Sequence, residues 1–193
     1  WFEARDGGPL PPFLAGQHLP IELSPIELQM TQPARRTYSL SGAPGDGRYR
    51  ISVKREDQGL VSRLLHDYLE PGAIVDARHP AGSFLPTKQG GPLVLVSAGV
   101  GLTPMVSALH ALAADPEPRE IWFVHGARDG AQHALGDEVR ALTAAHSHLN
   151  LHISYSRPRP EDRLGHDYHR EGRLDGRHVL ALAGDTLAHY FLC

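Results

Sequence analysis

Residues 93–105 read LVLVSAGVGLTPM, an apolar run that passes through a glycine-rich turn into a helical pattern. A continuous apolar run indicates a strand that is buried on both faces. Gly99 and Gly101 allow the backbone to turn sharply. Thr103 is a favoured N-cap and Pro104 a favoured first residue, so we expect the helix to begin there. Backbone N–H groups at such a helix start bind phosphate, which makes these four residues candidates for nucleotide binding.

The turn differs from the usual dinucleotide fingerprint. Its pattern is G-x-G-x-x-P rather than G-x-G-x-x-G, and residues 125–128, after the next apolar run, read HGAR and carry no acid that could bind a ribose. A tight turn used only for packing is the alternative interpretation. The strand–turn–helix context favours phosphate binding.

The second half of the chain alternates strand and helix patterns, which is typical of a parallel sheet with helices on its faces. We expect strands at residues 93–96, 121–124, 151–155 and 189–192, and helices that include residues 106–112 and 135–142.

The first half has short strand-like runs broken by Gly and Pro, which predicts an antiparallel barrel or sandwich. The runs lie at residues 1–4, 17–23, 36–40, 49–53 and 74–77. One helix is expected from Leu60 to Tyr68, ended by Pro71 and Gly72. A polar linker at residues 87–91 places the domain boundary between 89 and 90, which gives domains 1–89 and 90–193.

Composition excludes several classes of protein. The 193 residues include 19 basic and 22 acidic side chains, so bulk positive charge for nucleic-acid binding is absent. The single cysteine, Cys193, excludes a disulfide scaffold. No apolar run approaches the ~20 residues that span a bilayer, so we expect no membrane association and a cytoplasmic location. The 13 histidines form no His-Glu-x-x-His pattern, and we expect no metal site.

Both ends of the chain are apolar. Residues 1–4 and 189–192 lack the polar, flexible character that is usual at a natural terminus. We therefore expect this chain to be part of a longer protein.

A second candidate site lies in the first half. Arg36 and Tyr38 fall on one face of a strand, where a guanidinium and a ring suit a phosphorylated aromatic cofactor. Gly59 to Ser62 opens the helix of this half and offers backbone donors to a phosphate. The alternatives are an ordinary sheet surface and ordinary helix capping.

The order of the motifs resembles the ferredoxin–NADP reductase superfamily, and within it the reductase part of flavohaemoglobins. The motifs are RTYS at 36–39, VKRE at 53–56, GLVS at 59–62, HPAGSF at 79–84, GVGLTP at 99–104 and FLC at 191–193. This resemblance implies a six-stranded antiparallel flavin-binding β-barrel followed by an α/β parallel-sheet domain for the nicotinamide nucleotide. It implies FAD, with FMN as the alternative, and NADH, with NADPH as the alternative.

The resemblance also implies roles on the flavin side. Arg36 would pair with the flavin phosphate, and Tyr38 would pack against the isoalloxazine. Ser39 would form a hydrogen bond near flavin N5. Ser62 and the backbone near Gly59 would hold phosphate.

On the nicotinamide side, Gly99, Gly101, Thr103 and Pro104 would cradle the dinucleotide, and Cys193 would lie near the nicotinamide. The resemblance thus makes Tyr38, Ser39 and Cys193 the predicted catalytic residues.

The implied activity is transfer of hydride from NAD(P)H to FAD and then of single electrons to a partner. The partner would be a globin haem, a plant-type iron–sulfur domain or an oxygenase. The alternatives are a flavin- or nucleotide-binding regulatory module without turnover, and an FMN-type reductase component of an oxygenase. Arg157 and Arg159 follow the third strand and could bind the 2′-phosphate of NADPH or lie in solvent, and the resemblance favours NADH.

Overall fold

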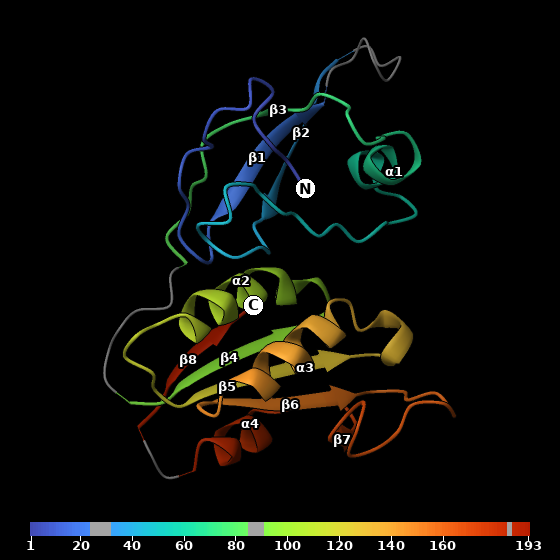
Figure 1. Cartoon of the computed structure of the whole chain (residues 1–193). Helices are drawn as coiled ribbons and strands as arrows, with labels where there is room; N and C mark the ends of the chain where they lie inside the picture. Colours follow the sequence, from blue (N-terminus) through green and yellow to red (C-terminus); the bar gives the residue numbers. More distant parts are fainter. Residues whose placement is uncertain (24–31, 85–90, 185–186) are drawn as a thin grey trace. The chain divides into compact units, whose positions relative to one another are not determined.

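The computed structural model describes residues 1–23, 32–84, 91–184 and 187–193. The chain forms two compact units, Trp1–Leu85 and Pro86–Cys193 (Figure 1). The expected boundary between residues 89 and 90 lies outside the described residues. An antiparallel sheet in the first unit and a parallel α/β sheet in the second confirm the predicted fold class.

The first unit is built on a three-stranded antiparallel sheet in the order β2-β1-β3. The strands are β1 (His18–Leu23), β2 (Ala34–Ser39) and β3 (Asp76–Ala77). The strictly alternating burial of β1 places Leu19 and Ile21 in the core. In the register of this sheet, Ile21 lies opposite Arg36 on one side and Ala77 on the other.

The strand count of the first unit differs from the six that the resemblance implies. Among the described residues, three segments form strands, and the runs at 1–4 and 49–53 form only the isolated bridges Phe2–Tyr49 and Leu40–Ile51. The intervening loop turns through Gly45 and Gly47, both with positive φ. Glycines in such turns limit the length over which neighbouring segments can pair.

Helix α1 (Leu60–Asp67) confirms the helix predicted in this half. Val61 and Leu64 are buried against Leu23 and Ala34, so α1 covers one end of the sheet. The helix ends before Pro71, as expected from the loss of a backbone donor at proline.

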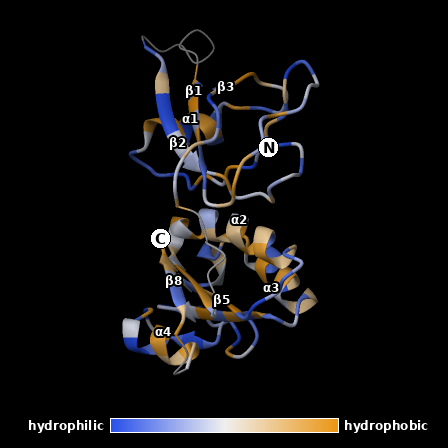
Figure 2. Ribbon diagram, turned by 90° about the vertical axis from the view of Figure 1, so that its left-hand side faces the viewer, coloured by the Kyte–Doolittle hydropathy of each residue, from blue (hydrophilic) through white to orange (hydrophobic). Residues whose placement is uncertain are grey.

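The second unit contains a five-stranded parallel sheet in the order β7-β6-β5-β4-β8. Its strands are β4 (Leu93–Ala98), β5 (Ile121–Ala127), β6 (Leu149–Tyr155), β7 (Arg170–Glu171) and β8 (His189–Leu192). The predicted strands of this half are confirmed, and β4 to β6 are longer than their apolar runs. Most of β5 is hydrophobic, whereas β2 carries a hydrophilic stretch (Figure 2).

Helices cover both faces of the parallel sheet. Helices α2 (Leu102–Ala113) and α3 (Gly136–Ala145) lie on one face, and α4 (Gly176–Leu182) lies on the other (Figure 1). The sequence did not predict α4 or β7. No helix among the described residues is long and apolar enough to cross a membrane.

Candidate functional site

The RTYS motif lies on β2, an edge strand of the first sheet. Arg36 is exposed, and its Nη1 donates to the Arg35 carbonyl at 2.7 Å. Tyr38 is half-buried and packs against both hydrophobic clusters of the unit, and this burial raises the pKa of its hydroxyl. Ser39 follows at the end of the strand. Arg36 and Tyr38 therefore lie on one face of the strand, and Ser39 lies on the other.

An open pocket of about 370 Å³ lies on this sheet. The Arg35 guanidinium is already paired with Glu22 at 2.6 Å. Among the described residues, no carboxylate pairs with Arg36 or Arg78, so two guanidinium groups of the pocket are available to an anion. The residues that line it are Pro20, Ile21, Glu22, Arg35, Arg36, Thr37, Asp76, Ala77 and Arg78.

The start of α1 is organised by Ser62. The Ser62 hydroxyl accepts the Glu56 N–H at 3.2 Å and donates to the Gly59 carbonyl at 3.3 Å. A Cβ added to Gly59 would collide with Ser62 Oγ. Because the hydroxyl proton is engaged, the backbone N–H groups of the first turn are the better phosphate donors here.

The glycine turn forms a single 3-10 turn, η1 (Gly99–Gly101), between β4 and α2. The predicted N-cap at Thr103 is wrong, because α2 begins at Leu102 with Gly101 as N-cap. The 3-10 turn already winds the backbone helically, so α2 begins at Leu102, two residues before Pro104. Thr103 Oγ1 instead donates to the Val100 carbonyl at 3.1 Å. Pro104 lies buried in the first turn of α2.

Cys193 lies against this turn. Its N–H donates to the Val96 carbonyl at 3.0 Å, and its carbonyl accepts the Ala98 N–H at 3.3 Å. A Cβ added to Gly101 would lie 2.6 Å from the Cys193 carbonyl carbon. Because β8 pairs with β4, Cys193 lies beside Gly101 although more than ninety residues separate them in the sequence. Its thiol is exposed.

Two buried histidines lie at the carboxyl end of β5 and in the segment that follows it, and local sequence patterns do not predict how they are arranged. His125 Nδ1 is hydrogen-bonded to Ser97 Oγ at 2.9 Å, and His133 Nδ1 to the Tyr155 hydroxyl at 3.0 Å. The two imidazole rings stack with centroids 5.0 Å apart. The Nε2 atoms of both rings are buried and find no hydrogen-bond partner among the described residues.

Burial keeps both imidazoles uncharged. Desolvation, and then the repulsion between the two rings when both are protonated, lowers the pKa of His125 to about 3. Desolvation, followed by the charge of Arg140, lowers the pKa of His133 to about 4. Together with Ser97 and Tyr155, these rings link the carboxyl ends of three parallel strands, where ligands bind in such sheets.

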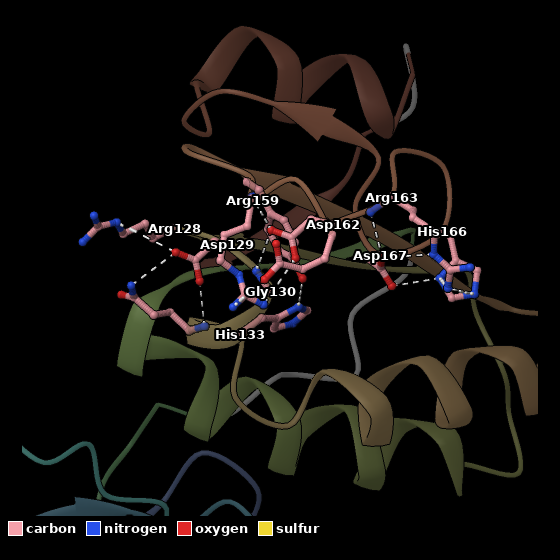
Figure 3. A network of polar contacts seen from close by, with 12 residues as sticks. Arg128, Asp129, Gly130, His133, Arg159, Asp162, Arg163, His166 and Asp167 are labelled. Carbon is pink, nitrogen blue, oxygen red and sulfur yellow. Dashed lines mark hydrogen bonds and ion pairs between the residues drawn. The ribbon is translucent and has the colours of Figure 1, made fainter.

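A carboxylate network joins the loops that follow β5 and β6 (Figure 3). Asp162 Oδ2 accepts the Gly130 N–H at 3.2 Å and the Arg159 N–H at 2.7 Å. The Arg159 guanidinium is paired with Glu161 at 3.0 Å. Asp129 follows β5 but caps η2 (Gly130–Gln132) by accepting the Gln132 N–H at 3.1 Å. The Asp129 carboxylate is therefore occupied by a hydrogen bond within the protein. The charge of the Arg159 guanidinium is offset by the carboxylate of Glu161.

Among the described residues, no group of three or more His, Cys, Asp or Glu side chains is arranged to hold a metal ion.

Comparison with known families agrees with this geometry. Residues 12–85 match the family described as an oxidoreductase FAD-binding domain, and residues 95–193 match the one described as an oxidoreductase NAD-binding domain. The chain belongs to the FAD- and NAD-binding oxidoreductases of the ferredoxin–NADP reductase superfamily. Within that superfamily it is similar to the reductase part of flavohaemoglobins.

Two curated relatives carry this likeness. A flavohemoprotein of Chromobacterium violaceum is 42% identical over 200 residues, covering 100% of this chain and 49% of the relative. A flavohemoprotein of Bacillus subtilis is 39% identical over 194 residues, covering 100% and 47%. The chain therefore spans about half the length of the curated relatives it matches.

Solved structures show the same fold. The flavohem-like FAD/NAD-binding domain of nitric oxide dioxygenase from Vibrio cholerae has a TM-score of 0.82 and 30% identity, covering 98% of this chain and 77% of that one. The flavohemoglobin of Malassezia yamatoensis with bound FAD and heme has a TM-score of 0.80 and 25% identity, covering 99% and 47%. These matches confirm the predicted superfamily and its cofactors, FAD and NAD(P)H.

Proposed function

We propose that this chain is a reductase module that takes hydride from NAD(P)H through FAD and passes single electrons to a haem, iron–sulfur or oxygenase partner. The observation that carries the proposal is the RTYS strand beside an arginine-lined pocket, with Arg36 unpaired by any described carboxylate. A globin haem is the partner that similarity to flavohemoproteins favours. We also propose a cytoplasmic location.

The residues of the first unit fit a flavin. A guanidinium without a carboxylate partner suits the phosphate, so Arg36 would anchor it. The half-buried Tyr38 ring offers an apolar surface to the isoalloxazine, and the Ser39 hydroxyl offers a hydrogen-bond donor near N5. When bound, FAD supplies a ring system that accepts hydride and releases electrons one at a time. Backbone N–H groups from Gly59 onward would hold phosphate, with Ser62 fixing their direction.

The residues of the second unit fit a dinucleotide. Gly101 has no side chain, so the turn can pack closely against the Cys193 carbonyl. At Gly99 nothing lies within 4 Å of the position of a Cβ, so the backbone there is open to a pyrophosphate. Gly99, Thr103 and Pro104 shape this turn. The exposed Cys193 thiol would lie near the nicotinamide.

We propose NADH as the preferred donor. The Arg159 guanidinium is paired with Glu161 at 3.0 Å and with Asp162 at 3.8 Å. A guanidinium that is already neutralised by carboxylates gains less from a 2′-phosphate. We therefore expect a higher kcat/KM for NADH than for NADPH.

An anaerobic absorbance titration tests the proposed activity. The purified chain is reconstituted with FAD and, in parallel, with FMN, and NADH is then added. We expect FAD to be retained and its visible band to be bleached by NADH. A bound flavin that stays oxidised would favour a binding module without turnover, and retention of FMN alone would favour the oxygenase-reductase alternative. Failure to retain either flavin would overturn the assignment of Arg36, Tyr38 and Ser39.

A further inference from the structure

Three histidines gather where β6 meets α4, away from the residues assigned above. His152 lies on β6, His169 precedes β7, and His178 lies on α4. The His152 ring centroid is 4.6 Å from that of His178 and 5.5 Å from that of His169. Three different elements therefore bring their imidazoles to one place on the second unit.

The closest contact joins two side-chain nitrogens of the same kind. His152 Nε2 and His178 Nε2 are 2.9 Å apart. Without a cation, one nitrogen must carry a proton and the other a lone pair. If the proton moves to Nδ1 of its own ring, both Nε2 lone pairs face one point between the rings.

This geometry is close to that of two imidazoles on one metal ion. Two nitrogens bound to Zn²⁺ at ~2.0–2.1 Å in a tetrahedral arrangement lie about 3.4 Å apart. The two rings would separate by about half an ångström to admit the ion, which a side-chain rotation supplies. His169 is held differently, because its Nδ1 accepts the Ile153 N–H at 3.0 Å.

Burial and local charge suit neutral ligands. His152 is 7% exposed, and desolvation, with the charges of His178 and His169, lowers its pKa to about 4. Metal-binding imidazoles must be uncharged, and burial favours the uncharged form of His152. The positive charge of Arg170 is offset by Asp175, which pairs with it at 2.9 Å.

We propose that His152 and His178 form a binding site for a borderline divalent cation of the Zn²⁺ type, which would fix α4 to β6. The described residues provide no ready set of three or more ligands, so water would complete the coordination shell. The bound ion would replace one hydrogen bond by two metal–nitrogen bonds between β6 and the helix that packs on the sheet. This site does not depend on the proposed reductase activity.

Calorimetric titration of the tag-free, chelator-treated chain with a zinc salt tests the proposal. We expect one Zn²⁺ per chain with micromolar or tighter affinity, and a higher midpoint of thermal unfolding. His178→Ala should weaken binding at least tenfold, whereas His178→Cys, which keeps a zinc ligand, should retain most of it. Circular dichroism of each variant verifies that it is folded.

Two matched variants exclude other zinc ligands. The rings of His146 and His148 also lie 5.8 Å apart, but His146 Nδ1 is hydrogen-bonded to the Leu142 carbonyl, so His146→Ala should not change the affinity. Cys193→Ser should not change it either. Millimolar affinity, equal affinity in folded His178→Ala, or loss of binding in Cys193→Ser would each overturn the proposal.

Discussion

Arg35 and Arg36 are neighbours on β2 that line the same pocket, but their guanidinium groups are engaged differently. Arg35 is paired with Glu22 at 2.6 Å, whereas Arg36 donates to the Arg35 carbonyl and pairs with no carboxylate among the described residues. We expect Arg36→Ala to weaken FAD binding about 10- to 150-fold, or ~1.5–3 kcal/mol, because a charge-assisted hydrogen bond to phosphate is lost. Titration of FAD fluorescence measures this.

Arg35→Ala is the matched control for this change. Its charge is already offset by Glu22, so the loss of FAD affinity should be clearly smaller. Equal losses of FAD affinity in the two variants would show that FAD binding depends only on the net charge of the pocket. An unchanged FAD affinity in Arg36→Ala would remove that residue from the flavin site.

At the scale of elements, the turn between β4 and α2 depends on the absence of one side chain. A Cβ at Gly101 would lie 2.6 Å from the Cys193 carbonyl carbon, and backbone cannot yield as a side-chain end does. We expect Gly101→Ala to displace β8 or the turn, to lower the free energy of unfolding by about 1–3 kcal/mol, and to raise the KM for NADH. Thermal unfolding and steady-state kinetics of the FAD-loaded chain measure these effects.

Gly176→Ala provides the control for Gly101. Gly176 opens α4, and a Cβ there would meet nothing within 4 Å. Alanine is the better helix former, so this change should leave the KM unchanged and stability equal or slightly higher. If Gly101→Ala behaved in the same way, the close approach of Cys193 to the turn would be contradicted.

The sequence predicted the long buried elements well and the short ones poorly. β4, β5 and α2 follow directly from apolar runs and helical spacing, because burial on both faces leaves a strong pattern. β7 and α4 are short, and no periodic run marks them. The capping position at Thr103 was missed because a 3-10 turn has no distinct sequence signal.

The candidate site was predictable to the same extent. Motifs that are local in sequence, such as RTYS and the glycine turn, were identified together with the cysteine after β8. The pairs Ser97–His125 and His152–His178 join residues 28 and 26 positions apart and depend on strand order. Single-sequence patterns do not encode such partners.

At the scale of the whole molecule, buried neutral histidines make stability depend on pH. His125 and His133 have pKa values of about 3 and about 4, against about 6.5 in an unfolded chain. Between these values the unfolded state binds more protons than the folded state, so the free energy of unfolding falls as pH falls. Stability that depends on the neutral imidazoles is complete above about pH 6.5. It is lost progressively as pH falls, down to about pH 4 for His133 and about pH 3 for His125.

Urea unfolding at about pH 7.5, 6 and 5 measures this loss, with a slope of up to about 1.4 kcal/mol per pH unit for each histidine. Carboxylates such as Asp167, whose pKa is lowered to about 2 chiefly by the Arg163 N–H, lose their contribution to stability only below about pH 4, outside this window.

The variant His133→Phe should keep the ring stack and lose the hydrogen bond to Tyr155 at every pH. It should also reduce the slope of the free energy of unfolding against pH by the share of one histidine, up to about 1.4 kcal/mol per pH unit. An unaltered slope in His133→Phe, or stability that rises toward pH 5, would show that these imidazoles are protonated in the folded protein.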